Sequence, residues 1–279
     1  TGAFCDPVRK LPDERAERML SLSQGIHLVF DRSFLSGDNA LVVPKTPDGR
    51  VLFVIPWHGH TLVGTTDTPI DKAELEPHAR ETEIDFVLET AGSYLAKQPT
   101  REDILSVFTG IRPLVRSAKS GNTAALSRDH TIEIDRSGML TITGGKWTTY
   151  RRMAEDAVNQ AMAIADFPHR PSTTSGLKIL PADTRTDTAG EQLHPDLPYF
   201  VGDVTRAFRD EMAYTVEDVL ARRTRALFLN ARAAVEIAPK VAEIMAGELG
   251  KNGSWIESQI ENFRQVAANY CAGVSKDKV

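Results

Sequence analysis

Cysteine is nearly absent from this sequence of 279 residues, which contains only Cys5 and Cys271, close to opposite ends. Two cysteines without a CxxC spacing exclude a disulfide framework and a cysteine-based zinc site. A reducing, cytoplasmic setting is therefore expected. Long apolar runs are also missing: no stretch approaches the roughly 20 residues that a membrane span requires, and no signal peptide opens the chain.

An excess of positive charge is missing too, because 33 Lys and Arg face 38 Asp and Glu, a net charge of −5. This balance gives no electrostatic support for general nucleic-acid binding, although a small anion can still bind in a locally basic cleft. The chain has no G-x-G-x-x-G after a strand and no Walker loop, so a dinucleotide has no self-contained cradle in it. With 41% apolar and 25% charged residues, the composition is typical of a soluble globular protein.

The first half of the chain predicts mixed α and β structure. Between Gly25 and Asp67 the pattern favours an antiparallel meander of three or four strands, with a turn at Thr46–Gly49. Farther along, the spacing predicts these elements: a helix over Glu81–Lys97, an extended segment over Ile104–Val115 stopped by Pro113, a hairpin over Ile132–Ile142, and a helix over Thr148–Ala165.

The second half predicts a linker and a helical domain. Pro168–Pro198 holds five prolines and few long apolar runs, which is typical of an extended linker. Beyond it the apolar spacing predicts three helices, over Val219–Asn230, Ala231–Leu249 and Trp255–Ala272. We therefore expect an α+β body over residues 1–168, a linker over 169–198 and an all-helical domain over 199–279.

The segment Met139–Arg151 brings a strand to Gly144-Gly145 and then starts a helix at once. Free backbone N–H groups at a helix start can bind anionic or carbonyl oxygens, and glycines let a planar ligand approach the backbone. Lys146 would place a cation beside such a ligand. On the pattern alone, an ordinary strand-to-helix turn with a solvated lysine is the favoured interpretation.

Arg112 lies between Gly110 and Pro113, on a backbone that the proline stiffens. Its planar guanidinium suits bidentate capture of a phosphate or carboxylate, and Arg128 could supply a second positive charge. Either arginine alone is more often a surface ion-pair partner.

Histidine offers one candidate acid or base. His27 alternates with apolar residues in a strand, where a hydrogen-bonded core role is the more common one, although its pKa range also suits proton transfer. His58 and His60 stand one residue apart from each other in a turn with no third ligand nearby, so no metal site is predicted.

Six segments, in this order along nearly the whole chain, resemble the FAD-dependent glycerol-3-phosphate dehydrogenases of respiratory metabolism. They are Gly25–Val29, Val54–Trp57, Gly64–Asp67, Gly110–Leu114, Ser127–Asp129 and Gly144–Arg151. Each segment alone is weak, but the six in order are specific. The helical tail, with Glu211–Ala213 and Thr215–Arg225, looks like the C-terminal domain of the same family.

The resemblance implies an α+β fold: an antiparallel substrate-domain sheet with the last strand and helix of an FAD-binding domain, followed by the helical domain. Thr1-Gly2 looks like the end of the family's Ala-Thr-Gly segment. The N-terminal FAD-binding segment of the family is accordingly expected to be absent from this chain, and the chain alone is expected to be inactive.

The same resemblance implies oxidation of sn-glycerol 3-phosphate to dihydroxyacetone phosphate, with FAD as cofactor. Arg112 and Arg128 would bind the substrate, Lys146 would stabilise developing negative charge, and His27 would be the catalytic base. The residues implied in cofactor binding are Gly110, Ile111, Gly145, Lys146, Trp147 and Thr148.

A quinone would accept the electrons, which implies peripheral contact with the inner face of the cell membrane and allows a homodimer. Two other functions compete with this one. An amino-acid oxidase of the same broad fold also holds a carboxylate with a Gly-x-Arg-Pro arginine, but Gly144-Gly145-Lys146 and the tail with Arg222-Arg223 argue against it. A non-catalytic assembly domain would not need Arg112, Arg128 and Lys146 together.

Overall fold

The computed structural model describes residues 1–44, 46, 49–116, 129–179 and 189–272. The chain divides into two compact units, each built from three segments. The first unit comprises Thr1–Gln24, Asp67–Pro77 and Gly110–Ala182, and the second comprises Gly25–Thr66, His78–Thr109 and Asp183–Val279. Strands β1 (Leu20–Asp31) and β6 (Ser106–Val115) each begin in one unit and continue into the other.

In the second unit, strands β1 to β4 form an antiparallel sheet. Its strands β2 (Leu41–Val43), β3 (Leu52–Trp57) and β4 (His60–Gly64) form a three-stranded meander. Strand β1 pairs with the outer side of β4, with His27 opposite Gly64, and β6 pairs with β1. The predicted antiparallel sheet is confirmed, with β1 added beside β4 rather than beside β2.

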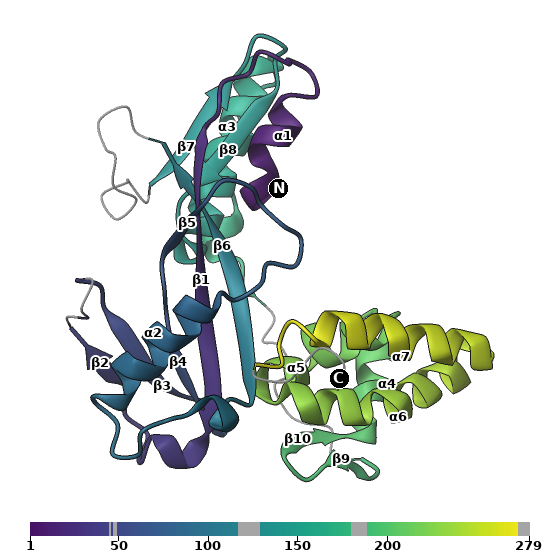
Figure 1. Ribbon diagram of the computed structural model, residues 1–279. Helices are drawn as coiled ribbons and strands as arrows, with labels where there is room; N and C mark the ends of the chain where they lie inside the picture. The colour runs from purple at the N-terminus through teal and green to yellow at the C-terminus, as the bar shows by residue number, and fades with distance from the viewer. Residues whose placement is uncertain (45, 47–48, 117–128, 180–188, 273–279) are drawn as a thin grey trace. The chain divides into compact units, whose positions relative to one another are not determined.

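One face of this sheet is covered by helix α2 (Glu81–Gly92), as Figure 1 shows. Because strand side chains alternate between faces, every second residue of β1 points toward the helix. The shared core contains Ile26, Leu28, Phe30, Val54, Val63, Ile84, Val87 and Ala91. The helix ends at Gly92, five residues before the predicted end at Lys97. His27 lies on the opposite face of the sheet.

The helical part begins with a hairpin of β9 (Gln192–His194) and β10 (Leu197–Phe200). The helices follow in this order: α4 (Val201–Arg209), the π-helix η7 (Asp218–Arg223), α5 (Ala226–Leu229), α6 (Ala231–Leu249) and α7 (Gly253–Ala267). The predicted helix over Ala231–Leu249 is confirmed. The predicted single helix over Val219–Asn230 is wrong, because the chain breaks at Thr224, in an extended conformation, between η7 and α5.

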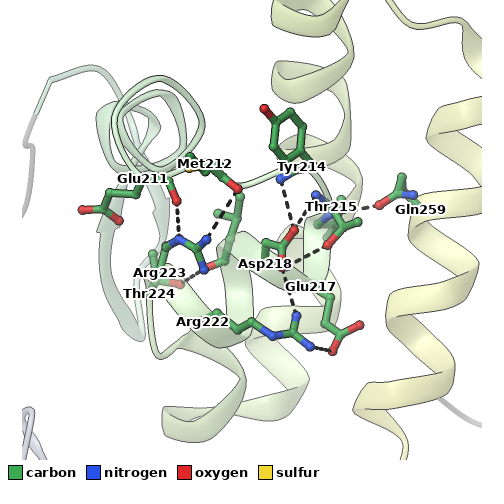
Figure 2. Close-up of polar contacts among 12 residues, drawn as sticks. Glu211, Met212, Tyr214, Thr215, Glu217, Asp218, Arg222, Arg223, Thr224 and Gln259 are labelled. Atoms are coloured by element: carbon green, nitrogen blue, oxygen red, sulfur yellow. Dashed lines mark hydrogen bonds and ion pairs between the residues drawn. The ribbon is translucent and has the colours of Figure 1, made fainter. Parts of the chain in front are cut away.

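The start of η7 is held by the carboxylate of Asp218, which accepts hydrogen bonds from the backbone N–H groups of Tyr214 (3.1 Å) and Thr215 (3.0 Å) (Figure 2). In return the Thr215 hydroxyl accepts from the backbone N–H of Asp218 at 3.0 Å. Burial alone would raise the pKa of Asp218, but these hydrogen bonds outweigh it and lower the pKa below its usual value. These reciprocal bonds between Thr215 and Asp218 form a capping box.

The first unit contains a second hairpin, β7 (His130–Ile134) with β8 (Leu140–Gly144), which confirms the hairpin predicted there. The 3₁₀ turn η5 (Trp147–Thr149) and helix α3 (Tyr150–Ile164) follow at once, as the sequence predicts. Helix α1 (Cys5–Arg9) and the strand β5 (Thr68–Ile70), paired with β1, complete the unit. Short 3₁₀ turns lie at Gly2–Phe4, Arg32–Phe34, Arg101–Asp103 and Thr174–Gly176.

Proline 113 does not end the extended segment as predicted. Strand β6 continues through Pro113 to Val115. Proline removes one N–H donor from a strand but fits its φ, so it is tolerated where the ladder does not need that donor. Within the described part of the chain, no helix combines the length and the apolar character needed to cross a membrane.

Candidate functional site

The glycine turn between β8 and α3 has the unusual backbone that the sequence suggests. Gly144 and Gly145 have φ angles of +77° and +76°, which side chains of L-residues rarely adopt. A Cβ on Gly144 would lie 2.8 Å from the carbonyl oxygen of Asp129, and one on Gly145 would lie 2.9 Å from Cε of Met153. Both glycines are therefore required by the close packing of β7, β8 and α3.

The next three residues, Lys146, Trp147 and Thr148, are exposed, and Trp147 shows 86% of its surface to solvent. The Trp147 ring leans on the ring of Tyr150, with 5.5 Å between the centroids. The Lys146 N–H donates to the Thr149 hydroxyl at 3.1 Å, which fixes the start of the helical run. The first N–H groups of a helix have no carbonyl partner inside it, so this exposed turn can receive an oxygen-rich ligand.

Arg112 lies on β6 beside Asp67, with 3.3 Å between Nη1 of the arginine and Oδ1 of the aspartate. Asp67 also accepts a hydrogen bond from the Ser23 hydroxyl. Asp67 was not among the predicted site residues, although it closes the Gly64–Asp67 segment of the resemblance. Because Asp67 orients the partly exposed Arg112, the planar guanidinium has a defined direction, a property that suits recognition of an anionic ligand.

Gly110 and Ile111 precede Arg112 on the same strand. In the described part of the chain, no atom beyond the two neighbours in sequence lies within 4 Å of the place where a Cβ on Gly110 would stand, so this backbone borders open space there. Ile111 packs instead against the small core of Cys5, Met19, Leu20 and Leu22. Of the two, Gly110 has the backbone geometry for close approach of a planar ligand. Ile111 instead anchors this part of β6 in the small core.

His27 belongs to the second unit, whereas Gly110, Ile111, Arg112, Gly145, Lys146, Trp147 and Thr148 belong to the first. From Leu22 to Phe30 every residue of β1 is buried except His27, which is partly exposed. Its imidazole stacks on the ring of Phe108, with centroids 5.3 Å apart and 17° between the planes. Neither Phe108 nor Gly64, which lies opposite His27, carried a sequence signal for a role at this histidine. Arg128 lies outside the described residues.

His58 lies in the turn between β3 and β4, and His60 begins β4; no metal site was predicted for the two. His60 Nδ1 lies 3.0 Å from the carbonyl oxygen of His58. Burial, and then the nearby charges of Arg225 and His60, lower the pKa of His58. In the segments that the structure describes, no three His, Cys, Asp or Glu side chains are grouped so as to hold a metal ion.

Two family models match the chain. Residues 1–151 match the model described as FAD dependent oxidoreductase. Residues 140–255 match the model described as the C-terminal domain of alpha-glycerophosphate oxidase. The two matches overlap over residues 140–151, which include the β8–α3 turn with Gly144, Gly145 and Lys146.

Mitochondrial glycerol-3-phosphate dehydrogenases are among the similar proteins. The protein of this name from Bos taurus is 35% identical over 310 residues, covering 95% of this chain and 42% of the relative. A probable mitochondrial glycerol-3-phosphate dehydrogenase from Caenorhabditis elegans is 34% identical, covering 95% of this chain and 43% of the relative. The chain thus spans less than half the length of these relatives.

A solved structure has the same fold. The glycerol-3-phosphate dehydrogenase from Bacillus halodurans, complexed with FAD, superimposes with a TM-score of 0.77 at 23% sequence identity. The superposition covers 99% of this chain and 62% of that one. The α+β fold expected from the sequence, with its helical C-terminal part, is therefore confirmed.

Proposed function

The chain belongs to the family of FAD-dependent oxidoreductases, and on this premise we propose that it carries the substrate-binding part of a glycerol-3-phosphate dehydrogenase. The reaction proposed is the oxidation of sn-glycerol 3-phosphate at C2, which gives dihydroxyacetone phosphate. The observation that carries the proposal is the 35% identity to a mitochondrial glycerol-3-phosphate dehydrogenase over 95% of this chain. The pairing of Arg112 with Asp67 adds support from the structure, since a phosphate ester needs such an oriented cation.

Residues of β6 and of the β8–α3 turn fit a flavin. Among the described residues, none beyond the chain neighbours has an atom within 4 Å of a Cβ placed on Gly110 of β6, and Lys146, Trp147 and Thr148 of the turn are exposed. A planar ring can approach a glycine backbone, and backbone N–H groups at a helix start suit its carbonyl oxygens. When bound, FAD supplies the hydride acceptor of the reaction.

Four polar residues of the chain then have proposed roles in this reaction. Arg112, together with Arg128, binds the anionic phosphate and the substrate oxygens and so orients C2. His27 accepts the proton of the C2 hydroxyl, for which an imidazole is suited near neutral pH. Lys146 places a positive charge where negative charge develops during the oxidation.

Helix α3 supports the further proposal that a nucleotide-binding part completes the cofactor site. None of its side chains is fully buried, and Tyr150, Val158 and Ile164 are exposed. Phe167, just after the helix, is 65% exposed. An amphipathic helix with a bare apolar face needs a partner surface, and we propose that this surface is the FAD-binding part of the same fold.

For the electrons we propose a quinone as acceptor. Quinones that serve respiratory enzymes dissolve in the membrane, so the complete enzyme would contact a membrane face peripherally. A homodimer is compatible with this arrangement and is part of the proposal only as one possible assembly.

The experiment that tests the function follows flavin absorbance in the FAD-containing enzyme during anaerobic mixing with sn-glycerol 3-phosphate. Bleaching of the oxidised flavin band by this substrate, and not by a panel of amino acids or by glycerol, supports the proposal. Bleaching by an amino acid alone would replace it with an oxidase function. A visible spectrum and an intact mass of the starting sample establish whether flavin is bound and at what chain length.

A further inference from the structure

We propose that Gly64, Phe108 and Phe228 are positioning residues for the His27 imidazole, and that the helical part of the chain thereby sets the orientation of this base. All four residues belong to the second unit. The inference rests on the proposed function, in which His27 is the base, and it adds the residues that fix the orientation of that base.

The His27 ring lies flat across its neighbouring strand because the residue opposite it is a glycine. In the antiparallel ladder His27 pairs with Gly64 of β4. A Cβ on Gly64 would come within 2.8 Å of Cγ of His27 and 2.9 Å of the Ile26 carbonyl oxygen. Directly opposed residues in such a ladder have Cβ atoms about 5 Å apart, so a ring that overlies its partner strand needs a partner without a side chain. Gly64 thus defines one side of the ring's site.

Phe108 defines the other side. Strand β6 pairs with β1 on the edge away from β4, so Phe108 and Gly64 flank the histidine from two different strands. The near-parallel stack of the two rings, 17° between planes at 5.3 Å, leaves the imidazole little freedom to rotate. The alternation of β1 places His27 on the face away from α2, and the residue is partly exposed there.

Phe108 is itself held by rings from two other elements. Phe228 of α5 packs edge-on against it, with centroids 5.2 Å apart and 82° between the planes. Trp57 of β3 lies at 6.1 Å, and Phe228 makes a further edge contact with Tyr270 at 5.5 Å. The position of Phe108 is therefore determined by the helical part and not by its own strand alone.

Backbone contacts make this connection rigid. The Ser106 hydroxyl donates to the carbonyl oxygen of Leu227 at 2.9 Å, and the Val107 N–H donates to that of Tyr270, also at 2.9 Å. These bonds attach the two residues before Phe108 to the residues that carry or contact Phe228. A displacement of α5 would thus move Phe108, and with it the surface on which His27 stacks.

The test compares two phenylalanines of the helical part. Phe228→Leu removes the edge contact on Phe108, and Phe208→Leu is the matched control, because Phe208 is also partly buried and makes an edge contact, with Tyr214 at 6.5 Å. Phe108→Leu removes the stacking partner directly, and Gly64→Ala pushes the imidazole out of its place. His27→Gln identifies the His27 signals in the spectra.

The first readout is the chemical shift of the His27 ring protons in the 279-residue chain with labelled histidine. A proton over the face of an aromatic ring is shifted upfield, so Phe108→Leu and Phe228→Leu should move these signals downfield, and Phe208→Leu should not. If Phe108→Leu leaves the signals in place, or if the Phe228 and Phe208 variants change them equally, the proposal is overturned.

The second readout is turnover of the FAD-containing enzyme. We expect Phe228→Leu to lower kcat about tenfold with KM unchanged, the effect of losing one edge-to-face ring pair. Gly64→Ala should lower kcat by about 100-fold, as for a base displaced by about 1 Å. A fall in kcat that matches in the Phe208 control would instead indicate general loosening of the helical part and would overturn the positioning role. If His27→Gln retains full kcat, the assignment of His27 as base fails, while the proton shifts still decide whether the three residues position the ring.

Discussion

At the scale of single residues, Arg112 and Arg116 offer a comparison on one stretch of chain. Arg112 is held beside Asp67, whereas Arg116, just past the end of β6, is exposed and its backbone N–H bonds to the carbonyl oxygen of Met19. A guanidinium that is oriented before the ligand arrives loses less conformational freedom on binding. Arg112 is therefore the residue of this pair that we propose to bind the anionic substrate.

We expect Arg112→Ala to lower kcat/KM for sn-glycerol 3-phosphate strongly, because it removes the proposed pair between the guanidinium and the substrate phosphate, and losing one partner of a charge pair that is desolvated on binding costs about 2–5 kcal/mol. Arg116→Ala is the control and should leave the kinetics close to those of the parent enzyme. Steady-state kinetics together with a thermal melt separate lost binding from lost folding. Unchanged kinetics in a folded Arg112→Ala enzyme would contradict the proposed role.

Gly145 and Gly110 differ in why they are glycine. Gly145→Ala should destabilise the fold by about 1–2 kcal/mol, since its φ is +76° and the new Cβ would crowd Met153. Gly110→Ala should leave folding stability nearly unchanged, because the new methyl group would meet no atom of the described residues within 4 Å, apart from those of its neighbours in sequence. Urea unfolding of the two variants measures the difference, and equal stabilities would refute it.

At the scale of elements, the π-helix η7 shows how one side chain holds an irregular loop. The Arg223 guanidinium donates from Nε to the carbonyl oxygen of Glu211 at 2.6 Å and from Nη2 to that of Met212 at 3.4 Å (Figure 2). Met212 itself has a positive φ of 58°, which is uncommon outside glycine. The loop before η7 therefore depends on Arg223 more than on its own backbone preferences.

We expect Arg223→Ala to lower the free energy of unfolding by about 1.5–3 kcal/mol, the range for hydrogen bonds to a charged group. Its neighbour Arg222 is the control. Arg222 makes exposed ion pairs with Glu217 (2.5 Å) and Asp218 (3.2 Å), and such surface pairs contribute about 0–1 kcal/mol. Urea titrations of both variants followed by circular dichroism check the ranking, and an Arg222 effect as large as that of Arg223 would contradict it.

The elements also show what the sequence could and could not predict. Helix α6 was predicted with its observed bounds from its apolar spacing, and the structure adds an Asn230 cap at its start and a left-handed Gly250 at its end. The break between η7 and α5 was missed, since apolar spacing does not show the bonds made there: the Thr224 hydroxyl donates to the Val219 carbonyl oxygen, and the Tyr199 hydroxyl, 26 residues away, accepts the N–H of Arg225. The spacing of apolar residues along the sequence carries no information about such bonds.

The same limit applies to the candidate site. The Gly-Gly turn and Arg112 carry local signals, namely glycines before a helix and an arginine held by a proline. Asp67 beside Arg112, and Phe108 over His27, lie 45 and 81 residues away from their partners along the chain. Only the pairing of the strands brings them together, so no local pattern could indicate them.

At the scale of the whole molecule, the sheet and the helical part of the second unit share their cores. Trp57 of β3 packs against the helical core, and Ala272, after α7, packs into the sheet core. Each part thus places a side chain in the core of the other. Parts joined in this way are expected to unfold together.

The prediction is a single unfolding transition for these two parts. Amide hydrogen exchange in β1 and β4 reports on the sheet, and exchange in α6 and α7 reports on the helices. The most protected amides of both parts should open with the same free energy. Opening of the helices at a clearly lower free energy, with the sheet still protected, would show that the helical part is a separate domain.

Both units are also discontinuous in the sequence, since each takes three segments of the chain in alternation. Because each unit combines separate segments of the chain, recombination within the gene is expected to affect both units together. A recombination breakpoint almost anywhere between codons 25 and 182 would unite segments from two parents inside both units at once, so surviving hybrids should be rare there. Crossovers nearer the ends would be tolerated more readily, and a lineage should therefore pass this stretch on as one block.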